Sequence, residues 1–479
     1  MNTKELLLLG LLVFSAAIAG CVLKKPPDAA AIKTESMATV AVPEQWTSLA
    51  AAPDVVSANW LATFRDERLT AAINEALAHN TDLKAGAARL EQARLYAKLA
   101  GAKLYPSVDV LARGGGKMSG DQSGLQGGIL SATWEVDLWG RVRYGRAAAA
   151  ADALSAQADF EFARQSIAAN VAKTWFLIIE TERQAALARG TIREHEQMVR
   201  LTEARVRIGA GNDEDVYVAR ASLGTYSDTL RQIEQARDDS RRALEILLGR
   251  YPAAAVQVSG DLPALPEAVP GGLPSELLER RPDVVAAERR VAAAFNRVHE
   301  AKAARLPAIK LTSGVSSISS DLFVLQDRDN PIWNLGASLL APVFTGGALK
   351  TQVEIRTAEQ KAALAAYASV GLRAFNEVEA ALAAEIAARD RERILVETLS
   401  HNQRALGVVR AQFKVGSTDL RFVTQRQLSL NAAQSALLRV QAEQRIQRVN
   451  LHLALGGSLE PGPQPAPVVI TAEKPPQPR

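Results

Sequence analysis

The stretch SATWEVDLWGRVRYGRAAAAAD, residues 131–152, changes its periodicity partway along. Up to Leu138 every second residue is apolar, which is typical of a strand with one apolar face. From Arg141 the sequence is rich in alanine with helical spacing, and this pattern continues to about residue 208. A helix of that length extends roughly 100 Å at 1.5 Å per residue. A strand that continues into such a helix with almost no loop indicates an architecture longer than a compact domain.

Two long segments of the chain resemble each other. DLKAGAARLEQARLYAKLAGAKLYPSVDV, residues 82–110, matches DVVAAERRVAAAFNRVHEAKAARLPAIKL, residues 283–311. In both, an Ala/Arg-rich helix ends at a proline and enters a strand, and the start of a strand is one of the few places where a sheet accepts proline. We therefore predict an internal duplication with a first structural repeat at 63–262 and a second at 263–456. Each repeat contains a helix, two strands, a long helix, a turn and a shorter helix.

The helices of the two repeats have corresponding lengths. In each repeat, two shorter helices laid end to end match the long one, which predicts a long helix packed beside a pair of half-length helices. The predicted helices span 69–103, 141–208 and 213–248 in the first repeat, and 275–304, 347–414 and 419–455 in the second.

Four segments alternate between apolar and polar residues, at 107–113, 130–138, 309–315 and 335–343. This alternation fits strands of a transmembrane β-barrel, and it also fits a half-buried sheet in a soluble domain. Four strands cannot close a barrel, since small barrels need about eight, and open edges in lipid leave costly unsatisfied groups. If the strands lie in lipid, several copies must therefore share one barrel. Three tryptophans flank the strands and are candidates for the aromatic girdle at the bilayer boundary: Trp134, Trp139 and Trp333.

The N-terminus resembles an export signal. Lys4 precedes an apolar run at 6–18 that is short for a membrane span, and the segment Ile18-Ala19-Gly20-Cys21 resembles a bacterial lipobox. Residues 1–20 are predicted to be a lipoprotein signal peptide, with lipid on Cys21, the only cysteine, and a lipidated arm at 21–62. An uncleaved anchor or an inert buried thiol is the alternative. Valine rather than aspartate follows the cysteine, which favours the outer membrane, and the proline-rich tail at 457–479 is predicted to be disordered.

Composition argues against nucleic-acid binding, and the motifs argue against catalysis. The 56 basic and 52 acidic residues are interspersed and aromatic residues make up 5%, so nucleic-acid binding has little support. No catalytic or phosphate-binding motif occurs, which predicts a protein that is not an enzyme and has no metal and no cofactor other than the covalent lipid. Five histidines lack metal-ligand spacing and are expected on exposed helix surfaces: His79, His195, His299, His401 and His452.

Several motifs together resemble one family. They are LLERRPDVVAAERRV at 277–291, WEVDLWGRVR at 134–143, LAPVFTGG at 340–347, and the paired turns at Gly211 and Gly416. The chain is similar to the outer-membrane factor family of TolC-like export ducts, in particular its lipidated NodT-type branch, which serves resistance-nodulation-division efflux pumps. The resemblance implies an α+β membrane protein. Four strands from each of three subunits would form one transmembrane β-barrel, continued by a long periplasmic α-helical barrel.

The same resemblance implies a passive exit duct for small molecules and a set of partners. These are two further copies of the chain in a homotrimer, a periplasmic adaptor (membrane fusion) protein, an inner-membrane transporter of the resistance-nodulation-division type, and outer-membrane lipid. An exit duct for type I secretion is an alternative that the lipobox disfavours. A non-channel lipoprotein scaffold that braces the cell envelope is the alternative from another class.

The resemblance also places function at two helical turns. Each turn has a glycine suited to a helix C-cap and then a polar N-cap candidate, Asn212 or Asp213 in the first and Ser417 or Thr418 in the second. The first turn would dock the adaptor through Gly211, Asp213, Glu214 and Asp215. The second would line the gate, with Phe413 as a steric ring and Asp419 and Arg421 in charged contacts, together with Gly416 and Gln425. Phe422 and Gln425 stand where some relatives carry gate carboxylates, which argues against a strongly cation-selective aperture.

Overall fold

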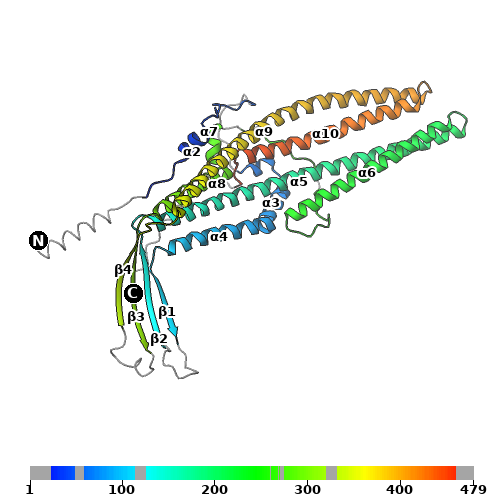
Figure 1. Ribbon diagram of the computed structural model, residues 1–479. Coiled ribbons are helices and arrows are strands. Elements are labelled where there is room, and N and C mark those ends of the chain that lie inside the picture. Colours follow the sequence, from blue (N-terminus) through cyan, green and yellow to red (C-terminus); the bar gives the residue numbers. More distant parts are fainter. Residues whose placement is uncertain are drawn as a thin grey trace. The chain divides into compact units, whose positions relative to one another are not determined.

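The structure is a computed structural model of the 479-residue chain (Figure 1). It describes residues 23–48, 59–113, 126–258, 260–267, 269, 274–319 and 332–459. The predicted signal peptide, the lipid site at Cys21 and most of the proline-rich tail lie outside the described residues and stay predictions.

Long helices dominate the described chain, and their lengths recur in the two halves. The first half contains α4 (Thr81–Ala102), α5 (Arg141–Arg207) and α6 (Asp213–Leu247), of 22, 67 and 35 residues. The second contains α8 (Pro282–Ala303), α9 (Ala348–Lys414) and α10 (Leu420–Ala454), again of 22, 67 and 35 residues. Shorter helices complete the set: α2 (Ala29–Ser36), the 3₁₀ helix η1 (Trp60–Phe64), α3 (Glu67–His79) and α7 (Pro274–Arg280).

Four antiparallel strands form one sheet in the order β1-β2-β3-β4 (Figure 1). They are β1 (Ser107–Arg113), β2 (Gln126–Val136), β3 (Ala308–Ser319) and β4 (Ile332–Leu340). The central pair joins the two halves of the chain, with Val136 opposite Ile309 and Gln126 opposite Ser319. The four predicted strands are confirmed, although β2 and β4 begin and end a few residues earlier than the alternation indicated. Among the described strands, β1 and β4 each have only one hydrogen-bonded neighbour.

The passage from β2 into α5 is as short as the sequence predicted. Asp137 follows the strand directly, and its two carboxylate oxygens accept hydrogen bonds from the backbone N–H groups of Val142 and Arg143, both at 2.9 Å. These N–H groups lie in the first turn of α5, where no partner within the helix is available. Arg141 also pairs with Glu135 on the strand at 2.7 Å. The strand and the helix are therefore fastened across a four-residue turn.

Two predicted helices are each divided in two. The helix expected at 69–103 breaks at Asn80, whose Oδ1 accepts the backbone N–H groups of Asp82 at 2.9 Å and Leu83 at 3.1 Å and so caps α4. The helix expected at 275–304 breaks at Arg281, directly before Pro282, because a residue before proline is disfavoured in helical geometry.

The described residues fall into two compact units. The first contains those of Met1–Ala41, Gly86–Phe160 and Pro282–Leu372, and the second those of Val42–Ala85, Glu161–Arg281 and Arg373–Arg479. Each predicted repeat therefore contributes to both units. Within the first unit lie the sheet, α4 from Gly86 onward, α8 and the N-terminal parts of the two long helices.

The first unit packs helices closely through small residues. A buried cluster there consists of Ala151, Ala292 and Ala293. A methyl group added at Gly145 would lie 2.9 Å from the Glu300 carboxylate, so this glycine permits the approach of α5 to α8. The alanine-rich composition of these helices thus allows their backbones to lie near one another.

The second unit has a larger apolar core. Trp60, Phe64 and Phe176 pack together there, with ring centroids 6.2 Å apart for the first two and 5.2 Å apart for the last two. Leu244 of α6 and Val449 of α10 belong to the same buried cluster. The half-length helices α6 and α10 pack beside the C-terminal parts of α5 and α9, as predicted: Arg241 pairs with Glu182 at 2.6 Å, and Arg391 pairs with Glu443 at 2.7 Å.

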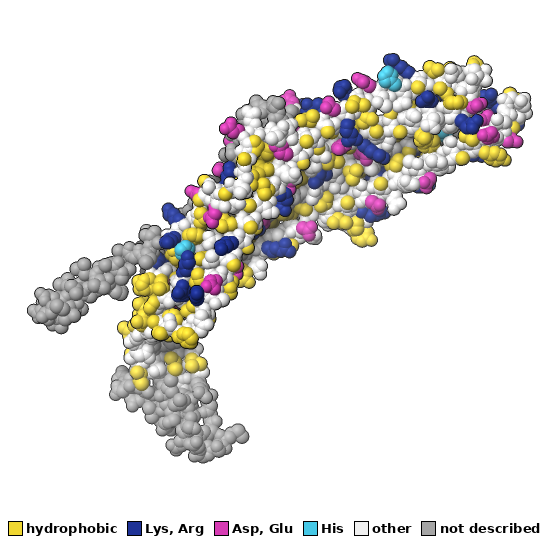
Figure 2. Space-filling view, turned by 45° about the horizontal axis from the view of Figure 1, so that its top comes forward, with side chains coloured by type: hydrophobic (Ala, Val, Ile, Leu, Met, Phe, Trp, Pro, Cys, Tyr) yellow, Lys and Arg dark blue, Asp and Glu magenta, His cyan; other side chains and the backbone are white. Residues whose placement is uncertain are grey.

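The distribution of charged side chains on the surface is the one that the composition predicted. Figure 2 shows basic and acidic side chains interspersed over one face, with no large area of a single sign. In the part of the chain that the structure describes, no helix combines the length and the apolar character that a membrane crossing requires.

Candidate functional site: the two helical turns and the sheet

The first helical turn joins α5 to α6. It closes with hydrogen bonds from Gly209 N–H to Val206 O at 3.0 Å and from Ala210 N–H to Arg205 O at 2.9 Å. The left-handed backbone, with φ of 73°, lies at Gly209 and not at the predicted Gly211. Gly211 serves a different purpose, because a methyl group there would lie 3.1 Å from Cβ of Arg205.

The start of α6 confirms one of the two predicted caps. Asn212 is the N-cap, and its side-chain oxygen accepts the N–H of Asp215 at 2.8 Å. Asp213, Glu214 and Asp215 follow in the first turn of the helix, where acidic side chains are favoured by the helix dipole. Asp213 and Glu214 are exposed and Asp215 is half-buried. The acidic run therefore has a local structural reason, and it also presents two carboxylates to solvent.

The second turn joins α9 to α10 and contains most of the predicted gate residues. Gly416 has a φ of 78°, as predicted, and its N–H donates to Phe413 O at 3.1 Å. The N-cap of α10 is Asp419, so the predicted caps Ser417 and Thr418 are wrong. The Asp419 side chain makes no capping hydrogen bond and is exposed, as are Arg421 and Gln425. Within the described residues neither charged side chain forms an ion pair, so both face solvent in the single chain.

Phe413 lies in a different environment from the one predicted. Its side chain is only 4% exposed, in an apolar cluster with Leu406, Leu420 and Val423. The burial argues against Phe413 as an exposed aperture residue in this conformation of the subunit. A steric ring of Phe413 stays a prediction that requires the side chain to leave this cluster.

One residue that the sequence did not single out joins the two turns. The Arg205 guanidinium carbon lies 4.8 Å from the centre of the Phe413 ring, and its Nη1 donates to Phe413 O at 3.3 Å. The same side chain donates to Ala210 O in the first turn at 3.3 Å. Arg205 therefore couples two turns that are about 200 residues apart in sequence, a contact for which the sequence offers no local signal.

Exposed apolar side chains surround both turns. Ile208 and Tyr217 flank the first turn and are 78% and 68% exposed, while Val415 and Phe422 flank the second and are 80% and 57% exposed. Such side chains gathered at the ends of two hairpins are typical of a surface that contacts a partner.

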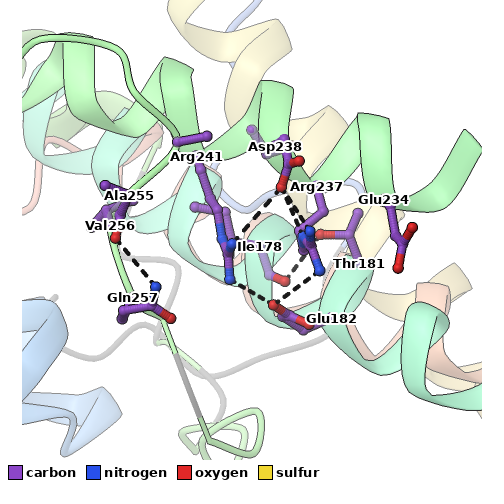
Figure 3. A network of polar contacts seen from close by, with 12 residues as sticks. Ile178, Thr181, Glu182, Glu234, Arg237, Asp238, Arg241, Ala255, Val256 and Gln257 are labelled. Carbon is purple, nitrogen blue, oxygen red and sulfur yellow. Dashed lines mark hydrogen bonds and ion pairs between the residues drawn. The ribbon is translucent and has the colours of Figure 1, made fainter. Parts of the chain in front are cut away.

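Ion pairs brace the C-terminal part of α6 against α5, far from the first turn (Figure 3). Glu182 on α5 accepts from Arg241 at 2.6 Å and lies 3.7 Å from Arg237, and both arginines also approach Asp238, Arg237 at 2.9 Å and Arg241 at 3.8 Å. The two arginines and the two carboxylates of this network together have no net charge. It is therefore suited to hold the hairpin together and not to bind a charged ligand.

The three candidate girdle tryptophans lie toward the two ends of the sheet. Trp134 and Trp139 are near the end that joins the helices, and their ring N–H groups donate to Leu104 O at 3.0 Å and Pro307 O at 2.8 Å. Trp333 is the second residue of β4, near the other end, and is 78% exposed. Their place at a bilayer boundary stays a prediction.

Both faces of the edge strand β4 are open in the single chain. All nine of its residues are exposed, including Leu335 at 85% and Leu339 at 70%. On the opposite edge, Val108 and Val110 of β1 are 64% and 75% exposed. Both edges therefore present apolar side chains and unpaired backbone groups with which a further strand can pair.

The histidines are partly different from what the sequence indicated. His79 and His401 are exposed and His299 is half-buried, but His195 and His452 are only 4% and 1% exposed. The expectation that all five lie on exposed surfaces is therefore wrong for these two. In the described part of the chain, no group of three or more potential metal ligands comes together.

A four-stranded sheet with open edges, continuing into hairpins of 35- and 67-residue helices, is the architecture of a subunit of an outer-membrane export duct. Residues 72–250 and 273–457 match the family described as outer membrane efflux protein, and the chain belongs to that family.

Relatives and a solved structure agree with this assignment over most of the chain. The pyoverdine export outer membrane protein OpmQ of Pseudomonas putida is 31% identical over 467 residues, covering 93% of this chain and 96% of its own. The cation efflux system protein CusC of Escherichia coli is 28% identical, covering 85% and 90%. The fold also matches the open-state crystal structure of the MtrE outer membrane channel of Neisseria gonorrhoeae with a TM-score of 0.77 at 28% identity, covering 92% of this chain and 98% of that one.

Proposed function

We propose that three copies of this chain form the outer-membrane exit duct of a tripartite efflux pump. Three four-stranded sheets would close one barrel of twelve strands, and the long helices would continue it as a tube in the periplasm. The observation that carries the proposal is the sheet with two open edges, because an open sheet in lipid leaves unpaired backbone groups that cost several kcal/mol each. Closure by neighbouring copies removes both edges.

Cysteine crosslinking between the two edges tests this closure. A cysteine at Val110 on β1 and another at Leu335 on β4 lie on opposite edges of one sheet, so a disulfide joins them only between subunits. We expect covalent dimers and trimers on denaturing gels, with Val108 and Leu339 as alternative positions that allow for the unknown register between subunits.

The matched control is the pair Val110→Cys and Leu130→Cys, which are opposite each other within one sheet. It should crosslink within the monomer without any ladder of oligomers. Single-cysteine variants measure the background from Cys21. Absence of covalent oligomers for every edge pair, with efficient crosslinking of the control, would contradict the shared barrel.

Conductance separates the duct from the scaffold alternative. The purified protein should form channels in planar bilayers and migrate as a heat-sensitive trimer on gels. An intact trimer with no conductance would favour a lipoprotein that braces the envelope.

The two turns are the proposed contact region for the adaptor, which would connect the duct to an inner-membrane transporter of the resistance-nodulation-division type. The exposed side chains Ile208, Tyr217, Val415 and Phe422 and the carboxylates of Asp213 and Glu214 support this proposal. A cysteine at Asp213 should crosslink to the tip of an adaptor hairpin. A cysteine at the exposed Ala186, which lies away from the turns, is the control.

The duct is proposed to be passive, without catalytic activity and without a cofactor beyond a lipid on Cys21. Relatives named for different cargoes, pyoverdine and cations, match this chain at 31% and 28% identity. That breadth supports a conduit whose cargo is selected elsewhere in the pump. Type I secretion is the second candidate, and an adaptor and transporter encoded next to this chain would decide between the two.

A further inference from the structure

The two helical hairpins of the second unit meet in a cluster of polar side chains, here called the polar node. Thr191 Oγ1 donates to Asn431 Oδ1 at 3.3 Å, and Gln427 Nε2 donates to the same oxygen at 3.1 Å. Arg410 Nη2 contacts Gln427 Oε1 at 2.6 Å and Glu194 Oε2 at 2.5 Å. The node draws side chains from all four helices: Thr191, Glu194 and His195 of α5, Tyr226 of α6, Arg410 of α9, and Gln427 and Asn431 of α10.

His195 is the unusual member of the polar node. Its side chain is 4% exposed, and its ring lies against Tyr226 with centroids 4.5 Å apart. Among the residues that the structure describes, neither ring nitrogen of His195 has a hydrogen-bond partner. A buried polar group without a partner costs free energy, and a buried charge costs more. The site therefore tolerates a neutral imidazole and disfavours an imidazolium.

The contact between α5 and α10 is polar on the side of the node away from the turns as well. Ser435 Oγ lies 2.7 Å from Gln184 Oε1, and Gln184 Nε2 donates to Ser435 O at 3.0 Å. Water can replace such bonds at a net cost of about 0.5–1.5 kcal/mol each. The hairpins can therefore move apart along this contact while each helix keeps its own backbone hydrogen bonds.

We propose that the polar node is a proton-operated latch: its side-chain bonds hold the two hairpins together while His195 is neutral, and protonation of the buried His195 favours their separation. The latch rests on the proposed function in one respect, namely that the released hairpins widen the periplasmic end of the duct.

The charges around His195 favour release in acid. Glu194 comes from α5 itself and Arg410 from α9, whereas α6 contributes the phenol of Tyr226, whose pKa is raised by burial, and α10 contributes only neutral amides. Burial lowers the pKa of His195 below 6.5, and Arg410 lowers it further, while Glu194 acts in the opposite direction. Protonation of His195 therefore adds a second positive charge near Arg410, and the neighbouring carboxylate of Glu194 is already paired with Arg410.

The linkage sets the size of the response. In separated hairpins the imidazole is hydrated and titrates near 6.5, so the separated state binds a proton in acid more readily than the closed state, in which burial lowers the pKa. Between pH 7.5 and 5.5 the ratio of separated to closed hairpins then rises by up to about tenfold in each subunit.

The test measures access to the contact between the hairpins. Ala188 lies on the same face of α5 as Gln184, Thr191 and His195, and is 8% exposed, whereas Ala186 is exposed. The purified full-length protein carrying Ala188→Cys or Ala186→Cys is labelled with a maleimide at pH 7.5 and pH 5.5. The ratio of the two labelling rates cancels the pH dependence of the thiol, and the protein without an added cysteine measures any labelling of Cys21.

We expect the ratio of Ala188→Cys to Ala186→Cys labelling to rise up to about tenfold in acid, and this rise to vanish in His195→Gln. The matched control is His401→Gln, which removes an exposed histidine of α9 and should respond as the unaltered protein does. If His195→Gln does not assemble, His195→Phe replaces it.

Three outcomes overturn the latch: a ratio independent of pH, an equal rise in the His195 variant, or a rise abolished by Glu194→Gln but not by the His195 variant. The labelling needs no conduction. A negative result therefore leaves the duct standing, and a protein that fails to conduct still tests the latch.

Discussion

Acid should destabilise this protein through His452. The imidazole is 1% exposed and stacks on Trp60, with ring centroids 5.7 Å apart and planes at 20°. Within the described chain neither of its ring nitrogens has a hydrogen-bond partner. Burial lowers the pKa of His452 to about 3, with a further contribution from the nearby Arg448 cation.

The sign and size of the effect follow from linkage. The unfolded chain binds a proton at His452 below its ordinary pKa of 6.5, while the folded chain does not until pH falls to about 3. The fold therefore keeps its full stability above about pH 6.5 and loses stability progressively as the pH falls. At pH 5 the loss attributable to this one side chain is about 2 kcal/mol per subunit, since pH 5 lies about 1.5 units below the unfolded pKa of 6.5 and each such unit costs about 1.4 kcal/mol.

The variant His452→Phe isolates this term. Phenylalanine can keep the stack on Trp60 and has no proton to bind, so its free energy of unfolding should change less between pH 7.5 and pH 5 than that of the unaltered protein, by about 2 kcal/mol. Urea unfolding of the detergent-solubilised protein, followed by tryptophan fluorescence, measures the difference. His401→Gln, at an exposed site, should leave the pH dependence unchanged. Equal pH dependence of His452→Phe and the unaltered protein would refute the assignment.

Three further perturbations probe other parts of the second unit and the gate. Glu245→Gln should lower the free energy of unfolding by about 1–3 kcal/mol at neutral pH, because its buried carboxylate accepts N–H groups including that of Val256 at 2.9 Å. Burial acts to raise the pKa of Glu245, but these donors lower it overall, so this contribution is present above pH 4.5 and disappears as pH falls through the lowered pKa. Glu379→Gln should loosen the segment around 47–48, since the Glu379 carboxylate accepts the N–H of Ser48 at 2.9 Å, and faster cleavage in that segment by a protease of broad specificity would report it. Asp419→Ala should reduce cation preference in bilayers, and unchanged selectivity would remove Asp419 from the gate.

The periodicity of the sequence predicted the long elements well. The helices expected at 141–208 and 347–414 are α5 and α9, each within one residue at either end, because 67 residues of unbroken helical spacing leave little freedom. The strand-to-helix passage after Val136 was equally clear, since the change from a period of two to helical spacing is abrupt. The break at Asn80 was missed, although an asparagine before Thr81 and Asp82 is itself a helix-start signal.

The details of the candidate site were less predictable. The first turn contains two glycines, Gly209 and Gly211, and either could adopt the left-handed conformation. The sequence does not distinguish them, and the structure places this conformation at Gly209. The burial of Phe413 and its contact with Arg205 depend on packing between helices that are far apart in the chain. The buried positions of His195 and His452 were missed because they depend on contacts with Tyr226 and Trp60 in other elements, which the local sequence does not show.

The pairing of β2 with β3 imposes an order on the synthesis and maturation of this chain. Val136 and Ile309 are opposite each other in the sheet, and the chain between them forms α5, α6, α7 and α8. The middle of the sheet therefore cannot assemble while the chain is still emerging, because its second half is not yet available. Contacts of such wide sequence separation form slowly. The hairpins of neighbouring helices, whose contacts are closer in sequence, should therefore form before the centre of the sheet does.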